Sequence, residues 1–237
     1  FRSFLEPATL SMVAAKITSE DKAVDQNNLI PISSNLDLLT SAAVYGANAS
    51  GKSNLAAALS FMRQMVLSSS RETQADEPIN LEPFRLSSTS EGQPASFEVK
   101  FLINGQKYRY GFEATRQRIM REWLYTTPTQ KEALLFTRTG EEIQVKPRSF
   151  KEGRGLEKLT RNNALFLSVV AQFNGPIARQ VRGWFKRIGY ASGLSDTGYQ
   201  SFTVSKFMED TEFREEIKKF VCALDVGIED ILGEKVE

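Results

Sequence analysis

Residues 46–53 read Gly46-Ala47-Asn48-Ala49-Ser50-Gly51-Lys52-Ser53, the P-loop pattern of two glycines framing four residues, then lysine, then a hydroxyl residue. Average composition gives such a match by chance in about 1 % of chains of this length. Residues 41–45 predict a short buried strand, and residues from 54 onward predict a helix, because no proline or glycine follows for about four turns. A strand, a glycine-bent loop and a helix N-terminus in this order predict a phosphate-binding site.

Each residue type in this loop has a chemical role in binding a polyphosphate. Gly46 and Gly51 are expected to adopt backbone angles closed to other residues and to let an anion approach the main chain. The amides of residues 48–53 then point inward, and the helix that starts near Lys52 adds its positive dipole end. Lys52 is expected over the β- and γ-phosphates, and Ser53 on Mg²⁺. A glycine-rich turn that only caps a helix is the alternative, but it requires neither Lys52 nor Ser53.

Composition limits the classes of protein to consider. With 237 residues, 41 % of them hydrophobic, the chain can form one large domain or two small ones. Its 30 basic and 29 acidic residues indicate no particular partner. A cytoplasmic protein is predicted, because Cys222 is the only cysteine and a secretory signal is missing. A membrane span is not expected, because no apolar run approaches ~20 residues. The absence of histidine excludes Ser-His-Asp and Cys-His catalysis and His-ligated zinc within these residues.

The sequence divides into three predicted segments. Residues 1–67 would contain the P-loop core strands and first helix, with two strands within 2–17, a turn at Glu6-Pro7 and a mobile polar loop at 18–28. Residues 68–147 would form an antiparallel β lobe after an exposed connection at 68–96. Residues 148–237 would form a helical segment. The chain starts at Phe1 and stops without a terminal cap, as a piece of a longer protein would.

The β lobe is predicted in most detail at 97–112. Asn104-Gly105 is a strong two-residue turn signal between alternating strands. It sets three apolar pairs on one face, namely Phe101 with Tyr108, Val99 with Tyr110, and Phe97 with Phe112. The other face pairs Lys100 with Arg109, either as an anion-facing patch or as a solvated face relieved by Glu98. Further strands are predicted at 119–125, 134–138 and 141–145.

Three helices are predicted in the third segment, at 163–173, from Pro176 onward, and at 212–224. The second would bury Ile177, Val181, Trp184, Phe185 and Ile188. Its opposite side carries Arg179, Arg182 and Lys186, either a nucleic-acid-binding stripe or a plain solvated face.

Beyond the P-loop, nucleotide hydrolysis also needs a second acidic Mg²⁺ ligand and a group that positions water. A candidate for this acidic ligand is Asp225, at the end of Val221-Cys222-Ala223-Leu224-Asp225. The apolar residues of this stretch continue a helical spacing from Phe213, however, which predicts the end of a helix.

Several stretches resemble the N-terminal half of the RloA-like (AAA15-type) ATPases of bacterial abortive-infection and restriction-associated loci. That family is related to the ABC-type heads of SMC, RecF and OLD proteins. The resemblance covers nearly all of the chain and is most specific in the P-loop and at 163–174. The matching stretches are Phe1-Arg2-Ser3-Phe4, 9–14, 45–54, Ser60-Phe61-Met62, Tyr108-Arg109-Tyr110-Gly111-Phe112, Glu122-Trp123-Leu124-Tyr125, 163–174 and Gly227-Ile228-Glu229-Asp230-Ile231.

This resemblance implies an α/β fold, a P-loop NTPase of ABC-ATPase-head type with an antiparallel β lobe and a helical segment. It implies that Arg2 approaches the phosphates and that Gln172 is a Q-loop residue joining Mg²⁺ and the attacking water. A glutamine at a helix end is more often only a surface residue. The signature motif, the Walker B pair and the switch residue have no counterparts here and are expected after residue 237. The nucleotide-binding set is then Gly46, Ala47, Asn48, Ala49, Ser50, Gly51, Lys52, Ser53, Asn54 and Arg2, with Lys52 catalytic and Ser53 and Gln172 on the metal.

The function expected from these observations is an ABC-type ATPase head of an anti-phage defence system, with ATP and Mg²⁺ as cofactors. ATP sandwiched between two heads implies a homodimer or higher homo-oligomer that controls a toxic effector. That effector would be a TOPRIM-like or HNH-type nuclease, in trans or as a C-terminal domain, and DNA is a candidate ligand. One alternative is a DNA repair or maintenance clamp of the SMC and RecF kind. Another is a scaffold that binds ATP without hydrolysing it.

Overall fold

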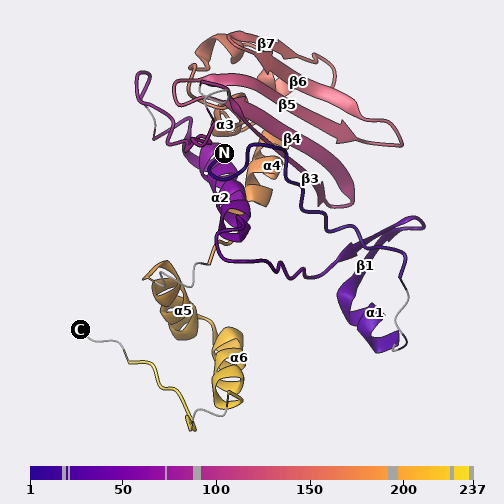
Figure 1. Cartoon of the computed structure of the whole chain (residues 1–237), viewed down its shortest axis with the longest axis vertical. Coiled ribbons are helices and arrows are strands. Elements are labelled where there is room, and N and C mark those ends of the chain that lie inside the picture. Colours follow the sequence, from indigo (N-terminus) through magenta and orange to yellow (C-terminus); the bar gives the residue numbers. More distant parts are fainter. Residues whose placement is uncertain are drawn as a thin grey trace. The chain divides into compact units, whose positions relative to one another are not determined.

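The computed structural model describes residues 1–17, 20, 22–72, 74–87, 92–191, 197–224 and 227–234 (Figure 1). Contacts divide the chain into two compact units, Phe1–Ile188 and Gly189–Glu237. These units follow contacts alone and do not test the three-segment division, which stays a prediction. Within the described residues, no helix combines the length and apolarity that crossing a membrane requires.

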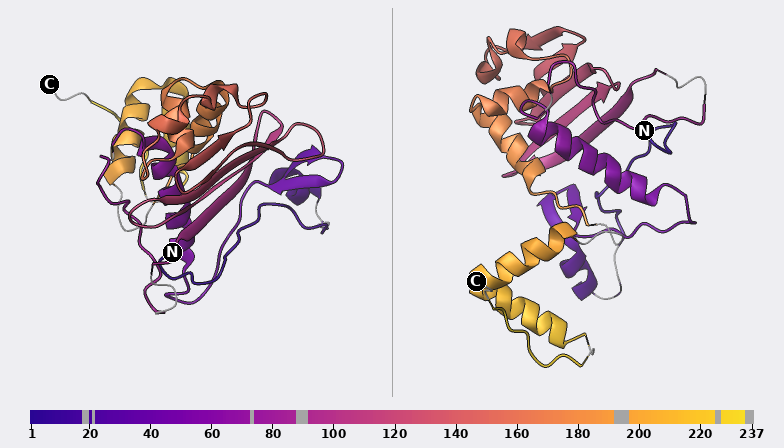
Figure 2. Two further views of the ribbon diagram at one scale, coloured as in Figure 1. Left: turned by 90° about the horizontal axis from the view of Figure 1, so that it is seen from above. Right: turned by 90° about the vertical axis from the view of Figure 1, so that its left-hand side faces the viewer.

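Five antiparallel strands in sequence order form the main sheet of the first unit. Each strand pairs with the next through a short connection, which is the simplest way to build a sheet from local hairpins. Helices cover one face of this sheet in both views (Figures 1 and 2). The strands are β3 (Ala95–Ile103), β4 (Gln106–Ala114), β5 (Ile119–Thr127), β6 (Ala133–Thr139) and β7 (Glu142–Val145), and the helices are α2 (Lys52–Ser68), α3 (Phe166–Gln172) and α4 (Pro176–Lys186).

The predicted hairpin is confirmed in its register. Phe101 lies opposite Tyr108, and the other two apolar pairs and the Lys100–Arg109 pair are also as predicted. Asn104 and Gly105 both have positive φ, 50° and 77°, as a two-residue turn of this type requires. On the other face, Glu98 accepts a hydrogen bond from Arg109 at 3.0 Å, which confirms the solvated, charge-compensated face. The strands predicted near 119–125, 134–138 and 141–145 are β5, β6 and β7.

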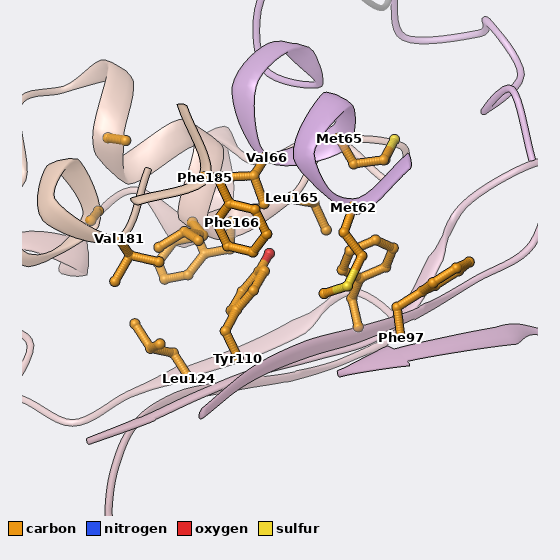
Figure 3. Packing of buried hydrophobic residues seen from close by; sticks show 14 of the residues in the cluster. Met62, Met65, Val66, Phe97, Tyr110, Leu124, Leu165, Phe166, Val181 and Phe185 are labelled. Carbon is orange, nitrogen blue, oxygen red and sulfur yellow. The ribbon is translucent and has the colours of Figure 1, made fainter. Parts of the chain in front are cut away.

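The core lies between this sheet and its helices. Side chains from α2, from the sheet and from α3 and α4 meet there (Figure 3). Tyr110, Phe112 and Phe185 are fully buried, and apolar burial at about 25 cal/mol per Å² is the main source of stability. On α2, Met62 and Val66 are buried in this core, whereas Leu59 is exposed.

Four predictions for the first 51 residues were wrong. Residues 41–45 form no strand: Val44 is 49 % and Tyr45 90 % exposed, and no strand among the described residues lies beside them to share hydrogen bonds. Residues 2–17 form no strands, only one isolated bridge from Val13 to Leu38. The predicted mobile loop contains α1 (Lys22–Asn28), although positions 18, 19 and 21 lie outside the described residues. Gly46 was expected to adopt backbone angles closed to other residues, but, unlike Gly51, it does not have a positive φ.

A small two-stranded sheet follows α1 and was not predicted. Its strands are β1 (Leu29–Ser33) and β2 (Leu36–Leu39), which pair antiparallel. The connection predicted after α2 contains no strand or helix between Ser68 and Ala95 in the described residues, but it is not exposed throughout, because Ser69, Ile79 and Leu81 are buried. Two short 3₁₀ helices, Lys151–Gly153 and Glu157–Leu159, lie between β7 and α3.

Helix α3 begins later than predicted, and α4 begins at Pro176 as predicted. Residues 163 and 164 instead lie in a turn in which the Ala164 amide donates to the Arg161 carbonyl at 3.3 Å, and Leu165 is extended directly before α3. The second unit contains α5 (Thr197–Glu209), which was not predicted, and α6 (Thr211–Cys222). Asp210 caps α6 by accepting from the Phe213 amide at 3.2 Å. The predicted helix end is confirmed at Cys222, whereas Asp225 and Val226 lie outside the described residues.

Candidate functional site: the loop before α2

The P-loop residues form a tight bend that leads directly into α2. Gly51 is the residue before the first helical turn and has φ +94°, a left-handed conformation that glycine adopts without strain. A Cβ at Gly51 would also lie 3.1 Å from the Ser3 hydroxyl oxygen. Ala49 has φ +64°, so this alanine is held in a strained left-handed conformation. The loop is therefore bent as a phosphate-binding loop requires.

Main-chain donors of this bend are free to bind a ligand. Across the described residues, the amides of Asn48, Ala49, Gly51, Lys52 and Ser53 have no hydrogen-bond acceptor in the protein. The Ser50 amide is the exception, because it donates to the Ala47 carbonyl at 3.2 Å. Five unsatisfied donors beside a helix N-terminus form a site suited to an anion with several oxygens, such as a polyphosphate.

Lys52 lies across the loop rather than out in solvent. Its Nζ donates to the carbonyls of Gly46 at 2.6 Å and Ala47 at 2.7 Å. Its Nζ also lies 3.5 Å from the Ser50 hydroxyl oxygen, so all three ammonium donors have a partner within the loop. A Cβ at Gly46 would lie 2.8 Å from that hydroxyl oxygen, a contact that rotation of the Ser50 side chain can relieve. Lys52 thus holds the bend closed through its contacts with Gly46, Ala47 and Ser50.

The N-terminal segment places Arg2 beside the first turn of α2. Its Nη1 lies 3.5 Å from Asn54 Oδ1, and Asn54 Nδ2 donates to Ser3 Oγ at 2.7 Å. Arg2 Nη2 also forms an ion pair with Glu82 at 2.8 Å. The structure therefore brings Arg2, Asn54 and the P-loop together, although they are far apart in sequence.

Gln172 is not brought to this loop. It is exposed at the end of α3, and α3 is attached to the opposite end of α2 through the Ser168 hydroxyl, which donates to the Ser70 hydroxyl at 2.9 Å (Figure 1). Helix α2 is about 26 Å long at 1.5 Å per residue. A shared Mg²⁺ site of Ser53 and Gln172 does not form within this unit as described.

Ser53 offers one hydroxyl at an exposed position of the first turn of α2. No group of three or more Cys, Asp or Glu side chains that could hold a metal occurs in the part of the chain described here. The loop residues thus fit a polyphosphate, and Ser53 fits one ligand position of a Mg²⁺ that takes its remaining ligands from phosphate and water.

A buried acidic network in the sheet was missed by sequence reasoning. Glu122 is fully buried and accepts hydrogen bonds from the amides of Phe166 at 2.7 Å and Leu167 at 3.0 Å and from the Tyr110 hydroxyl at 3.0 Å. It thereby caps α3 across the core. Burial raises the pKa of Glu122, although these donors and Arg138 oppose the shift. Its place in an alternating strand gave no signal, because only the tertiary structure brings α3 to it.

Asn163 explains why α3 starts late. Its Nδ2 donates to the carbonyls of Gln74 at 2.6 Å and Glu77 at 2.9 Å, which ties the chain before α3 to the connection after α2. The stretch 163–174 therefore has a structural role in joining these two parts.

The surface has two hollows away from the P-loop. One, of about 240 Å³, lies on the outer face of the sheet, and the other, of about 680 Å³, is lined by the 75–78 and 115–118 loops. No P-loop residue lines either of them.

Comparison with known proteins agrees with the loop geometry. Residues 41–178, more than half of the chain, match the model of the family described as "AAA domain, putative AbiEii toxin, Type IV TA system". No curated protein and no solved structure gives a significant match. The matched range contains the whole P-loop, α2, the five-stranded sheet and α3. The chain therefore belongs to this AAA-domain family of P-loop NTPases linked to abortive infection and toxin–antitoxin systems.

Proposed function

We propose that this chain binds ATP with Mg²⁺ through residues 46–53, as the N-terminal part of an ABC-type ATPase head. The observation that carries the proposal is the bend before α2, with five unsatisfied amides and Lys52 across it. The family match supports a P-loop NTPase in general. The ABC-head assignment rests on the resemblance of the sequence to RloA-like ATPases.

In this proposal each residue of the loop binds a different part of the triphosphate or its metal ion. The loop amides and the N-terminus of α2 bind phosphate oxygens, and the ammonium of Lys52 lies over the β- and γ-phosphates. Ser53 holds Mg²⁺, which when bound neutralises phosphate charge. Asn54 and Arg2 stand at the side of the same turn. Hydrolysis also requires an acidic Mg²⁺ ligand and a water-positioning residue from another part of the protein or another subunit.

The biological setting is proposed to be anti-phage defence. The family description links its members to abortive infection and toxin–antitoxin systems. ATP binding would drive two heads together, as homodimer or higher homo-oligomer, and this engagement would control a nuclease or another toxic effector. Effector control from a partner is consistent with the absence of histidine-based chemistry in this chain.

ATP binding is tested by titrating fluorescent ATP with Mg²⁺ into the wild type, Lys52→Ala and Lys146→Ala. Lys146 is exposed and outside the site, so its variant controls for loss of a positive charge. We expect binding by the wild type and Lys146→Ala and none by Lys52→Ala. Equal affinity in Lys52→Ala would end the assignment.

Head engagement is tested separately on the full-length protein with its genomic partner. Light scattering after size exclusion, with and without ATP, reports assembly, and cleavage of supercoiled DNA reports effector output. We expect ATP to increase the mass of the wild type but not of Lys52→Ala. If ATP binds and neither readout changes, the defence mechanism fails while ATP binding stands. Absence of ATP turnover with intact binding would favour a non-hydrolysing scaffold.

One observation favours the alternative of a DNA clamp of the SMC and RecF kind. Helix α4 has no acidic residue and carries Arg179 and Lys186 on its exposed side, with Arg187 directly after it. Arg182 belongs to the fold instead, because it donates to the Leu67 carbonyl at 3.2 Å. DNA binding that Arg179→Glu and Lys186→Glu weaken together, without a change in effector output, would support the clamp.

A further inference from the structure

Arg2 is held in a conformation that non-glycine residues rarely adopt. Its φ is +48°, a strained conformation that persists only where the surroundings fix it. The neighbouring Phe1 ring packs on Phe61 and Phe97 at centroid distances of 5.8 and 5.2 Å, so the core anchors this segment. The backbone of Arg2 is therefore fixed beside α2, and only its side chain can move.

Glu82 holds Arg2 at two points. The Arg2 amide donates to the Glu82 carbonyl at 2.9 Å, and its guanidinium pairs with the Glu82 carboxylate at 2.8 Å. Arg2 Nε is buried without a hydrogen-bond partner among the described residues. The guanidinium thus has donors to spare, and Glu82 is its one close anionic partner in the part of the chain that the structure describes.

The segment that carries Arg2 touches the loop itself. A Cβ built on Gly51 would meet both Ser3 and Phe4, at 3.1 and 3.3 Å, and Asn54 is bonded to Ser3. Arg2 Nη1 lies 3.5 Å from Asn54 Oδ1, which places the guanidinium beside the first turn of α2 while Nη2 contacts Glu82. Arginine suits an exchange of one anion for another because its planar fork binds carboxylate and phosphate in the same way.

We propose that Glu82 is a latch that occupies the Arg2 guanidinium and releases it to a polyphosphate bound in the loop. This inference rests on the proposed function and concerns the regulation of the same site. Phosphate must compete with Glu82 for Arg2, so the latch weakens polyphosphate binding. The side chains are 35 % and 56 % exposed, so solvent screens the pair and the latch is weak enough to open.

The test is a double-mutant cycle on the full chain with two probes, ATP with Mg²⁺ and inorganic tripolyphosphate. Glu82→Gln keeps the shape of the side chain and removes its charge, and we expect it to tighten both ligands about twofold to fivefold, the factor for a screened ion pair. Arg2→Ala and Arg2→Lys should weaken both. The double variant Arg2→Ala/Glu82→Gln should match Arg2→Ala, because Glu82 acts through Arg2. Glu72→Gln, an exposed partner of Arg71 after α2, is the matched control.

The outcomes separate the latch from the site. If the wild type binds neither probe, the proposed function and the latch both fail. If Lys52→Ala loses binding but Glu82→Gln leaves it unchanged or weaker, only the latch is overturned. If Glu82→Gln tightens binding equally with and without Arg2, Glu82 acts as a bulk charge and the latch is also overturned. Thermal unfolding of each variant confirms that the affinities belong to folded protein.

Discussion

The main sheet and the loop at residues 46–53 are held in different ways. No described residue among 1–51 is buried, whereas β3 to β6 and the helices over them contain a continuous apolar core. The sheet is fixed by burial and by hairpins between neighbours in sequence. The loop is fixed by backbone conformation and a few polar contacts. The difference shows that a ligand-binding loop can be fully shaped while its flanking segment remains exposed, because its donors must stay open to a ligand.

The largest expected difference between the two regions is in stability. Phe112→Ala removes a fully buried ring that packs between Phe97 and Tyr110 and should lower the free energy of unfolding by about 3–5 kcal/mol. Tyr45→Ala removes an equally large ring that is 90 % exposed and should change it by less than about 0.5 kcal/mol. Urea unfolding measures both. A similar loss in Tyr45→Ala would mean that residues 41–45 are packed.

A smaller stability effect, with a pH signature, is expected at Glu122. Glu122→Gln should lower the free energy of unfolding by about 1–3 kcal/mol at acidic pH, because an amide cannot replace all three hydrogen bonds. Burial raises the folded-state pKa of Glu122 above its ordinary value of 4.5. Between these two pKa values the folded state holds a proton on Glu122 that the unfolded state has released. The resulting stabilisation of the folded state is therefore complete below pH 4.5 and is lost as pH rises through the raised pKa.

The pH dependence is measured by urea unfolding of the wild type and Glu122→Gln between pH 4 and 7. We expect wild-type stability to decline relative to the variant as pH rises. Glu6→Gln, in the exposed N-terminal region, is the control and should follow the wild type at every pH. Parallel wild-type and Glu122→Gln profiles would show that Glu122 does not titrate in this range.

Two glycines with similar backbone angles sharpen the comparison further. Gly51→Ala and Gly105→Ala each place a Cβ at positive φ, and each should cost about 1–2 kcal/mol of backbone strain. Strain at Gly51 also distorts the amides of the loop, so we expect ATP affinity to fall at least about tenfold. Gly105 is in the hairpin turn with open space around it, so its variant should lose stability and keep ATP affinity. Equal ATP affinities would contradict a loop held by its conformation.

The smallest effect is expected at Ala49. Ala49→Gly relieves strain at φ +64° but adds backbone entropy to the unfolded chain, so stability should change by less than about 1 kcal/mol. ATP affinity should hold or rise slightly, because the same bend forms with less strain. Isothermal titration calorimetry at one temperature decides this, and a large loss of affinity would mean that the Ala49 methyl group contacts the ligand.

Local signals in the sequence predicted much of the fold. Asn104-Gly105 and the alternation around it gave the exact pairing of β3 with β4, and Pro176 gave the start of α4. These features depend on residues close in sequence, whose conformational preferences act before any distant contact forms. The strand predicted at 41–45 failed for the complementary reason. A strand needs a neighbour for its hydrogen bonds, and apolar composition does not supply one.

The sequence by itself determined the P-loop, the helix after it and the antiparallel hairpins, because each is set by residue types at short, fixed spacings. Only the tertiary structure decided that Lys52 closes the loop on the Gly46 carbonyl, that Glu122 caps α3, and that Glu82 meets Arg2 beside the loop. Those contacts join residues separated by about forty positions or more, or depend on the exact course of the chain. Packing of the whole core fixes them, and no short pattern can encode that.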